Sequence, residues 1–285
     1  MIERNITYTP KGTQIEGKAG LKSTNRKMIE ELFSSKELIL RLFIRDFSVR
    51  FRQSILGFAW IIIMPLITVL MFVMMSYSGI LNISDAGIPY PLYAITGLSI
   101  WNFFSGGVVT CSASLVGAGN MVAKINFPKI SLIVAASGQH LLDVLIRFIL
   151  IVLIALYYGI QPGFDWIIMS LLSIIPLYIF MLGIGFVMSL FTTIVRDVTS
   201  IMGLFFTGLM LMTPVVYPIK GDNMLAYINQ LNPLNYLINV PRDLITKGTT
   251  DLLYGYMFTS LFSIAVCYAG WRLFHISQSK VVERI

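Results

Sequence analysis

The sequence of 285 residues is 56% hydrophobic and only 12% charged, whereas an average soluble domain is about half apolar and about a quarter charged. This composition excludes an ordinary water-soluble domain. The formal net charge of +7 could suggest a nucleic-acid partner, but eleven of the 21 Lys and Arg residues precede residue 56, ahead of the first long apolar run. We therefore interpret the basic charge as a membrane-topology signal and expect no nucleic-acid partner.

The N-terminal part of the chain divides into a polar leader and a predicted helix. Residues 1–35 hold too few apolar side chains to offset the entropy of ordering, so we expect a flexible cytoplasmic leader without regular structure. This stretch also lacks the apolar core of a secretory signal peptide. Residues 36–53 read KELILRLFIRDFSVRFRQ, with apolar side chains at helical spacing and arginines between them. The pattern predicts an amphipathic helix lying in the membrane interface.

Six apolar segments follow, and we expect residues 36–285 to form one all-α transmembrane domain. The predicted spans cover about residues 56–81, 92–116, 130–158, 166–194, 201–216 and 252–274. Pro65 interrupts the first span, where a membrane helix tolerates it as a kink. Residues 218–251 mix apolar side chains with Asn, Pro and Gly, which predicts one or two short helices that re-enter the outer leaflet between the fifth and sixth spans.

The cations indicate the orientation of these spans. With the N-terminus inside, the inner segments hold 17 cations, namely the eleven before residue 56 and Lys124, Lys129, Arg196, Arg272, Lys280 and Arg284. The outer segments hold three, Lys220, Arg242 and Lys247, and Arg147 lies within a span. The positive-inside rule therefore places both termini in the cytoplasm.

Residues suited to catalysis are scarce. The chain has two histidines and two cysteines, and Cys111 and Cys267 lie in apolar stretches without the spacing of metal ligands. No GxxxxGK[ST] phosphate loop occurs, so we expect no catalytic residue, metal or bound cofactor in this chain. An autonomous channel or a membrane glycosyltransferase is the alternative from another class. Asp85, Asp165 and Asp222 are spread over separate predicted outer loops, which disfavours the glycosyltransferase.

One intramembrane polar set lies in the third span. His140, Asp143 and Arg147 are spaced by three and four residues, so they share one helical face. Asp143 and Arg147 can pair within the helix. The set either lines a hydrophilic path or fixes helix packing, and we favour packing because a proton-coupled transporter usually needs more than one carboxylate at depth.

Two further features allow a functional and a structural interpretation. Aromatic side chains of the first and fifth spans could stack on sugar rings along a channel or could face lipid. These candidates are Phe58, Trp60, Phe72, Tyr77, Phe205 and Phe206. The predicted cytoplasmic loop NMVAKINFPK at residues 120–129 suits a short helix that docks into a groove, but a plain turn with inner lysines is equally consistent with it.

Four segments in this order resemble the permease subunits of ATP-binding-cassette exporters for O antigen, capsular polysaccharide and teichoic acid. They are RDFSVRFRQSILGFAWIIIMPL at 45–66, NMVAKINFPK at 120–129, VRDVTSI at 195–201, and TPVVYP with LNPLNYLINVPRDLI at 213–218 and 231–245. The resemblance extends from about residue 36 to the C-terminus. Thr213 departs from the family pattern, which more often has serine before the proline, although the hydroxyl is kept.

The resemblance implies a homodimeric permease in the bacterial inner membrane, bound to two ATPase subunits that hold ATP and Mg²⁺. Lys124, Phe127 and Pro128 would belong to the helix that couples the permease to the ATPase, and residues 223–247 would form a re-entrant periplasmic gate. The helix at 36–53 would be an interfacial gate helix. Its arginines would meet the diphosphate of an undecaprenyl-linked polysaccharide or else anchor the helix to anionic lipid; they are Arg41, Arg45, Arg50 and Arg52.

O antigen is the most favoured cargo under this resemblance. Capsular polysaccharide and teichoic acid are alternatives within the same family. An exporter of drugs or small lipids would share the six-span plan, but the segments RQSILG and NPLNYL disfavour it.

Overall fold

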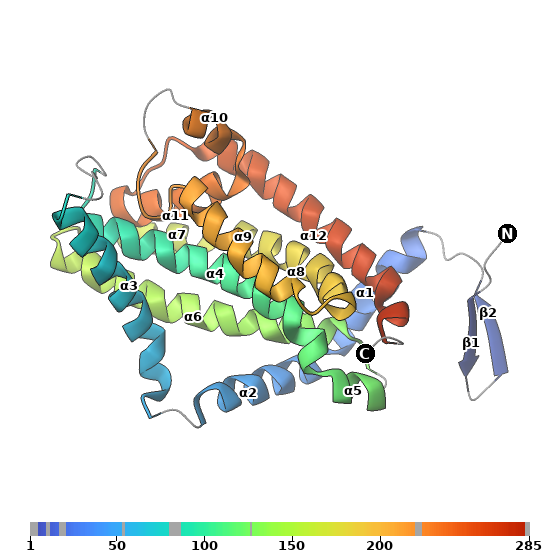
Figure 1. The fold of residues 1–285 in the computed structure, drawn as a ribbon. Helices are drawn as coiled ribbons and strands as arrows, with labels where there is room; N and C mark the ends of the chain where they lie inside the picture. Colours follow the sequence, from blue (N-terminus) through green and yellow to red (C-terminus); the bar gives the residue numbers. More distant parts are fainter. Residues whose placement is uncertain are drawn as a thin grey trace.

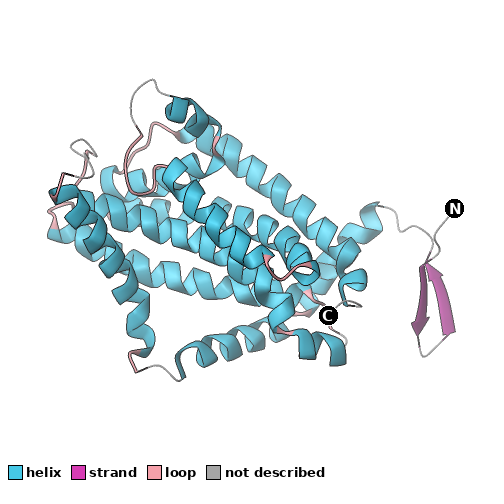
Figure 2. Ribbon diagram, viewed as in Figure 1, coloured by secondary structure: helices cyan, strands magenta, loops and turns pink. Residues whose placement is uncertain are grey.

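The computed structural model describes residues 5–9, 12–16, 21–52, 55–79, 87–125, 127–219 and 224–282. These residues form a bundle of long helices with one short β-hairpin near the N-terminus (Figures 1 and 2). The longest helices are α4 (Tyr90–Gly117), α6 (Ile130–Tyr157), α8 (Ile175–Ile194) and α12 (Leu253–Val282). α8 packs against α4 and α12, while α4 also packs against α6.

The structure has regular elements within residues 1–35, where the sequence predicted a leader without them. Strands β1 (Asn5–Thr9) and β2 (Gly12–Glu16) pair in an antiparallel hairpin, and α1 spans Leu21–Ser34. α1 buries Met28 to 2% exposure, and Asn25 accepts a hydrogen bond from Tyr268 of α12 at 3.1 Å. Composition suggested disorder because α1 has few apolar side chains, and its polar contacts with α12 involve residues far away in the sequence.

The helix predicted at residues 36–53 is present as α2 (Lys36–Arg52). It lies along α6, where the Phe43 ring faces Gly138, and a Cβ at Gly138 would approach Phe43 Cδ2 to 3.1 Å. The lack of a side chain at Gly138 thus lets α2 come close to α6. A 3-10 turn, Gly57–Ala59, then leads into α3 (Trp60–Tyr77), which continues through Pro65.

Five helical segments in the described part of the chain are long and apolar enough to cross a membrane. They cover Gly57–Tyr77, Tyr90–Gly117, Ile130–Tyr157, Phe164–Ile194 and Leu253–Gln278. The remaining predicted span, residues 201–216, is present as the shorter helix α9 (Val198–Met212). Its 15 residues correspond to about 22 Å at the α-helical rise, compared with about 30 Å of hydrocarbon. Thr213 ends the helix because its backbone is extended.

The predicted span at 166–194 is not one continuous helix. α7 (Phe164–Leu172) and α8 are separated by Ser173 and Ile174, and Pro176 lies in the first turn of α8. Proline has no N–H for the hydrogen bond to residue 172, and its ring crowds that carbonyl, so the helix breaks at this point. The two helices still count together as one apolar span, Phe164–Ile194.

Two short helices occupy the region predicted to re-enter the membrane. α10 spans Met224–Leu231 and α11 spans Pro233–Lys247, joined at Asn232, whose side chain accepts the N–H of Leu234 at the start of α11. This cap satisfies one of the backbone donors that a helix start leaves unpaired. α11 ends at Gly248, which has a positive φ of 73° that favours glycine.

α4 is the central helix of the bundle. Within its apolar window 83% of residues are buried, against 17–39% for the other four spans. Small residues allow this close packing. A Cβ on Gly107 would collide with the Met181 side chain, and a Cβ on Gly185 would come within 2.7 Å of Cys111 Cβ. α4 therefore contacts its neighbours at short distance, as small-residue packing in membrane bundles requires.

Gly183 permits a similar approach between α8 and α12, since a Cβ there would lie 2.7 Å from both Cα and N of Cys267. We expect Gly183→Ala to push the two helices apart and lower the free energy of unfolding by about 1–3 kcal/mol. Gly208→Ala is the matched control, because a Cβ at Gly208 meets nothing within 4 Å. Thermal unfolding of the detergent-purified protein measures both, and equal melting temperatures would contradict the packing role of Gly183.

Candidate functional site

An ion pair joins α2 to α6. Arg50 Nη1 donates hydrogen bonds to Oδ1 and Oδ2 of Asp143 at 3.1 and 2.9 Å. The Asp143 side chain is 6% exposed and that of Arg50 is 38% exposed. The sequence suggested pairing of Asp143 with Arg147 one turn along α6. Instead Asp143 uses the cation of the helix packed beside it, and the described contacts include no hydrogen bond or ion pair between Asp143 and Arg147.

The other two members of the intramembrane polar set lie close to this pair. His140 Nε2 is 2.9 Å from Thr110 Oγ1, so α6 is also bonded to α4. Arg147 Nε is buried and has no hydrogen-bond partner in the described part of the chain. Together these contacts connect three helices, α2, α4 and α6, which is the arrangement that a helix-packing role requires.

The arginines of α2 do not all lie in one place. Arg45 and Arg50 line a cavity of about 470 Å³ between α2 and the end of α4, together with Asp46, Val49, Gly117, Ala118, Asn120 and Met121. Arg45 Nε is 2.7 Å from Asp46 Oδ1. Arg41 pairs with Glu37 at the solvent-exposed start of α2, and the Arg52 side chain lies outside the described residues. Two of the four predicted cations thus face one shared cavity.

A groove of about 460 Å³ runs between α3, α4 and α9. Of the six predicted channel aromatics, the structure brings Phe72 and Phe206 into its lining. Phe58, Trp60, Tyr77 and Phe205 are exposed elsewhere on the surface. The polar side chains of the groove, which sequence reasoning did not single out, are Thr68, Asn102, Ser105, Thr110 and Thr207.

The lining of this groove combines aromatic rings with hydroxyl groups. Trp101 packs edge-on against Phe206, with ring centroids 6.3 Å apart, and Phe72 lies on the α3 side. Such a surface suits a sugar chain, because ring faces pack on C–H groups while hydroxyls bond to neighbouring polar groups. The sequence contained one signal for the groove, namely the polar residues within α4, which are unusual for a membrane span. This signal is hard to recognise because small polar residues also occur where membrane helices simply pack together.

The predicted cytoplasmic loop holds a short helix, α5 (Gly119–Lys124), and not a plain turn. Lys124 and Ile125 are exposed, whereas Phe127 and Pro128 are partly buried. Lys129 Nζ lies 5.4 Å from the centre of the Phe127 ring. Partial burial lowers the pKa of Lys129, while the nearby charge of Glu31 raises it. α1 therefore reaches the same corner of the bundle as the loop, which composition gave no means of predicting.

Glu31 also ties α1 to the last helix, since Glu31 Oε2 is 3.2 Å from His275 Nδ1. α5, α1 and the end of α12 thus meet at one end of the bundle (Figure 1). This end presents a short helix with an exposed cation and an exposed apolar residue, which is a surface able to bind another protein.

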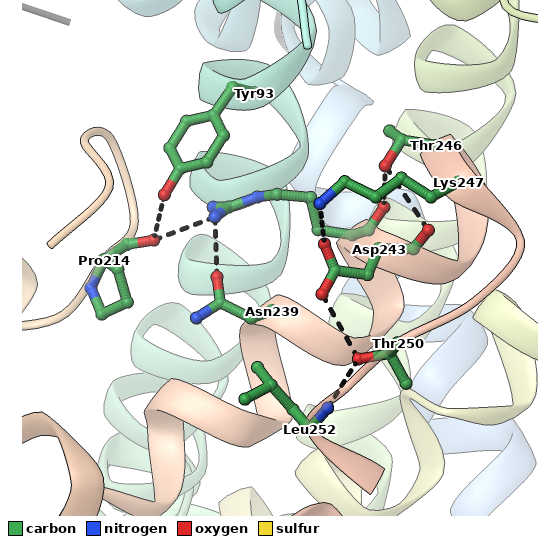
Figure 3. A network of polar contacts seen from close by, with 9 residues as sticks. Tyr93, Pro214, Asn239, Asp243, Thr246, Lys247, Thr250 and Leu252 are labelled. Carbon is green, nitrogen blue, oxygen red and sulfur yellow. Dashed lines mark hydrogen bonds and ion pairs between the residues drawn. The ribbon is translucent and has the colours of Figure 1, made fainter. Parts of the chain in front are cut away.

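The opposite end of the bundle is held by a buried cation, Arg242 of α11, which is 2% exposed. Its Nη1 donates to the carbonyl of Pro214 at 3.0 Å and to Asn239 Oδ1 at 2.8 Å, and its Nη2 donates to the carbonyl of Val215 at 2.7 Å. The guanidinium lies 3.8 Å from the Tyr93 ring centre, and the Tyr93 hydroxyl donates to the same Pro214 carbonyl. Figure 3 shows Tyr93, Pro214 and Asn239 meeting at this network.

This network caps the end of α9. Asn229 Nδ2 donates to the Met212 carbonyl at 2.6 Å, and Asn232 Nδ2 donates to Thr213 Oγ1 at 3.0 Å. The final carbonyls of a helix have no partner within the helix, and here Asn229 of α10 supplies a donor for the Met212 carbonyl, while Arg242 of α11 binds the carbonyls of Pro214 and Val215 just beyond the helix. Sequence reasoning treated Arg242 only as an outer cation and missed this role, because the partners are backbone carbonyls far away in the sequence.

These features define a multi-pass membrane protein with a polar and aromatic groove, one end that carries the short helix α5 and an opposite end with a buried polar network. Within the described residues no three His, Cys, Asp or Glu side chains gather as metal ligands would. Residues 37–246 match the ABC-2 type transporter family, so the chain belongs to this family of membrane transport subunits.

The chain is also similar to curated proteins of two bacteria. It is 28% identical to an O-antigen export system permease protein RfbA of Klebsiella pneumoniae over 76% of this chain and 83% of that protein. A second RfbA protein of the same organism is 29% identical over the same shares of the two chains. The RfbA protein of Myxococcus xanthus is 22% identical, but the alignment covers 91% of this chain and 99% of that protein.

We expect Asp143→Asn to weaken the attachment of α2, because the Arg50 cation loses its charged partner. The loss in the free energy of unfolding should be about 1 kcal/mol, the low end of the range, since solvent screens the partly exposed Arg50. Glu37→Gln is the control on the same helix. It breaks the ion pair with Arg41, in which both side chains are about 80% exposed, and it should change the free energy of unfolding by less than about 0.5 kcal/mol. Chemical denaturation of the purified protein measures the free energy of unfolding of both variants. Equal losses would contradict the role of the Arg50–Asp143 pair in attaching α2 to α6.

Arg242→Met keeps the length of the side chain but removes the donors for the carbonyls of Pro214 and Val215. The Pro214 carbonyl keeps its bond from Tyr93, but the Val215 carbonyl and Asn239 Oδ1 lose their donor, so we expect the free energy of unfolding to fall by about 1–3 kcal/mol, the cost of leaving buried polar groups unpaired. Lys247→Met on the same helix is the control, because Lys247 is 51% exposed and pairs only at the surface with Asp243. Thermal unfolding measures both variants. If both had the melting temperature of the parent protein, the network would not hold the end of α9.

Proposed function

We propose that this chain is the membrane subunit of an ATP-driven exporter of lipid-linked polysaccharide, with O antigen as the cargo. The observation that carries the proposal is the agreement of two independent features. The relatives with which the chain aligns over most of its length are O-antigen export permeases by name. The groove between α3, α4 and α9 offers aromatic faces together with hydroxyl and amide groups, which is the chemistry that a glycan requires.

In this proposal the chain crosses the inner membrane six times, with α9 as the fifth crossing. Residues 213–217, which follow α9 and bond to Tyr93, Arg242 and Asn232, would complete the distance that the 15-residue helix does not cover. An even number of crossings puts both termini on one side, and the excess of cations in the segments next to them favours the cytoplasm. α10 and α11 would then dip into the outer leaflet as a gate.

A homodimer would complete the conduit. α3 is only 17% buried within its apolar window, and α9 buries just Met202 and Phe206. The polar groove lies between these two exposed helices, and polar side chains at membrane depth normally face a bundle interior or water. A second copy placed over this face would enclose the groove, while lipid alone would leave its polar groups facing hydrocarbon.

The energy would come from two ATPase subunits that hold ATP and Mg²⁺. α5 with Lys124, Ile125 and Phe127 would dock on the ATPase, so that closure of the nucleotide-bound ATPase pair moves this end of the bundle. Arg45 and Arg50, which line the cavity next to α5, would receive the diphosphate of the undecaprenyl carrier, since guanidinium groups bind phosphate oxygens well. Carrier recognition and ATPase docking would then lie side by side.

The proposal is tested by deleting the gene and staining the surface glycan. We expect surface polysaccharide to disappear, lipid-linked glycan to accumulate inside the cell, and the complementing full-length protein to co-purify with an ATPase. Phe127→Ala, at the proposed docking helix, should reduce ATPase co-purification without preventing membrane insertion of the permease. Normal surface polysaccharide in the deletion strain would overturn the proposed function.

A further inference from the structure

Asn102 is an exception on the most buried helix of the bundle. Its neighbours Trp101, Phe103 and Phe104 are between 1% and 3% exposed, whereas Asn102 itself is exposed. It is the thirteenth of the 28 residues of α4, about 18 Å along the helix from Tyr90 at the α-helical rise. If α4 crosses the bilayer, this amide lies near the middle of the hydrocarbon layer.

The environment of Asn102 is the groove between α3, α4 and α9. The hydroxyls around it bond to carbonyls of their own helices: Thr68 to Met64 at 2.9 Å, Ser105 to Trp101 at 2.9 Å and Thr207 to Gly203 at 2.9 Å. The fourth hydroxyl, Thr110, is bonded to His140. Thr68, Ser105 and Thr207 thus satisfy their donor atoms within their own helices, as membrane helices usually require, and Thr110 shares a hydrogen bond with His140.

Within the described part of the chain the carboxamide of Asn102 makes no hydrogen bond, whereas the four hydroxyls that line the same groove are bonded. A carboxamide has two donors and an acceptor with two lone pairs. Leaving these groups unpaired in hydrocarbon is costly, so an amide at this depth needs either water or a ligand. The asparagines at the capped end of the bundle, by contrast, are bonded, for example Asn239 Nδ2 to Asn235 Oδ1 at 2.7 Å.

We propose that Asn102 is a glycan-binding residue of the conduit, whose carboxamide exchanges hydrogen bonds with the hydroxyls of the passing sugar chain. This inference rests on the proposed export function and names the contact within it. The donor and acceptor of one carboxamide match a pair of neighbouring sugar hydroxyls, one accepting and one donating. Phe72 and Phe206 line the same groove and supply ring faces for the C–H side of a sugar.

The groove fits the passage of a chain better than tight capture of one sugar. The other polar groups have satisfied donors and offer only remaining acceptor lone pairs, so Asn102 provides the free donors. A moving chain needs contacts that are favourable yet weak enough to release. A single amide among hydroxyls and aromatic rings has this property and tolerates different sugars.

The test uses the full-length protein with its ATPase partner, expressed in the deletion strain. Asn102→Leu, which has a similar size but no polar group, should reduce the rate at which pulse-labelled glycan reaches the surface by about fivefold or more. Membrane amount and ATPase activity should stay unchanged, and Asn102→Gln, which keeps the carboxamide, should retain most export. Ser112→Ala is the matched control on α4, because Ser112 is buried and bonds to the Val109 carbonyl.

The outcomes separate this inference from the proposed function. If the wild-type protein does not restore surface glycan, the export function itself fails. If the wild-type protein restores it and Asn102→Leu exports equally well, only the role of Asn102 fails. The glycan-binding role would also be overturned if Asn102 instead bonds to a second copy of the chain. In that case Asn102→Leu would lose the dimer. Asn102→Cys, in a background with Cys111 and Cys267 replaced by alanine, would then form a disulfide between two chains.

Discussion

Hydrocarbon supplies no hydrogen-bond partners, and the position of nearly every described polar side chain within the bundle follows from this constraint. Serine and threonine hydroxyls of the long helices return to carbonyls one turn back, as Thr96 and Ser189 do. Two buried charged groups have close partners: Asp143 faces Arg50, and Arg242 faces three oxygens and a tyrosine ring, whereas the buried Nε of Arg147 has no hydrogen-bond partner in the described part of the chain. The exceptions therefore carry information, because an unpaired polar group at depth has a cost that packing alone does not explain.

α4 connects the three places where polar groups gather. Near its start Tyr93 joins the Arg242 network, at its middle Asn102 enters the groove, and further along Thr110 bonds to His140 beside the Arg50–Asp143 pair. Because α4 is packed tightly against α6 and α8, these sites are held at fixed spacing along one rigid helix. α3 and α9 are packed far less closely, so any opening of the groove is expected from these two helices and not from α4.

The parts of the fold that were predictable are those governed by local pattern. Apolar length predicted the spans at 92–116, 130–158 and 252–274, and helical spacing predicted the helix at 36–53. Errors arose where a distant partner decides the outcome. α1 is bonded to α12 through Asn25 and Tyr268, and the choice of Arg50 over Arg147 depends on how α2 lies along α6. The break before Pro176 was visible in the sequence, but a proline in a span is also compatible with a kink, as at Pro65.

For the candidate site, chemical type was predictable but placement was not. Aromatic residues were expected along a channel, and two of six line the groove, since residue type does not reveal which face of α3 or α9 is turned inward. Aromatic rings are common on lipid-facing surfaces, whereas an unpaired carboxamide in mid-helix is rare. Asn102 is thus the more specific marker of a hydrophilic path, although it was less prominent in the sequence than the rings around it. In a single chain α3 and α9 on either side of the groove expose large apolar side chains, and in the proposed homodimer these would form the contact with the second copy that encloses the path.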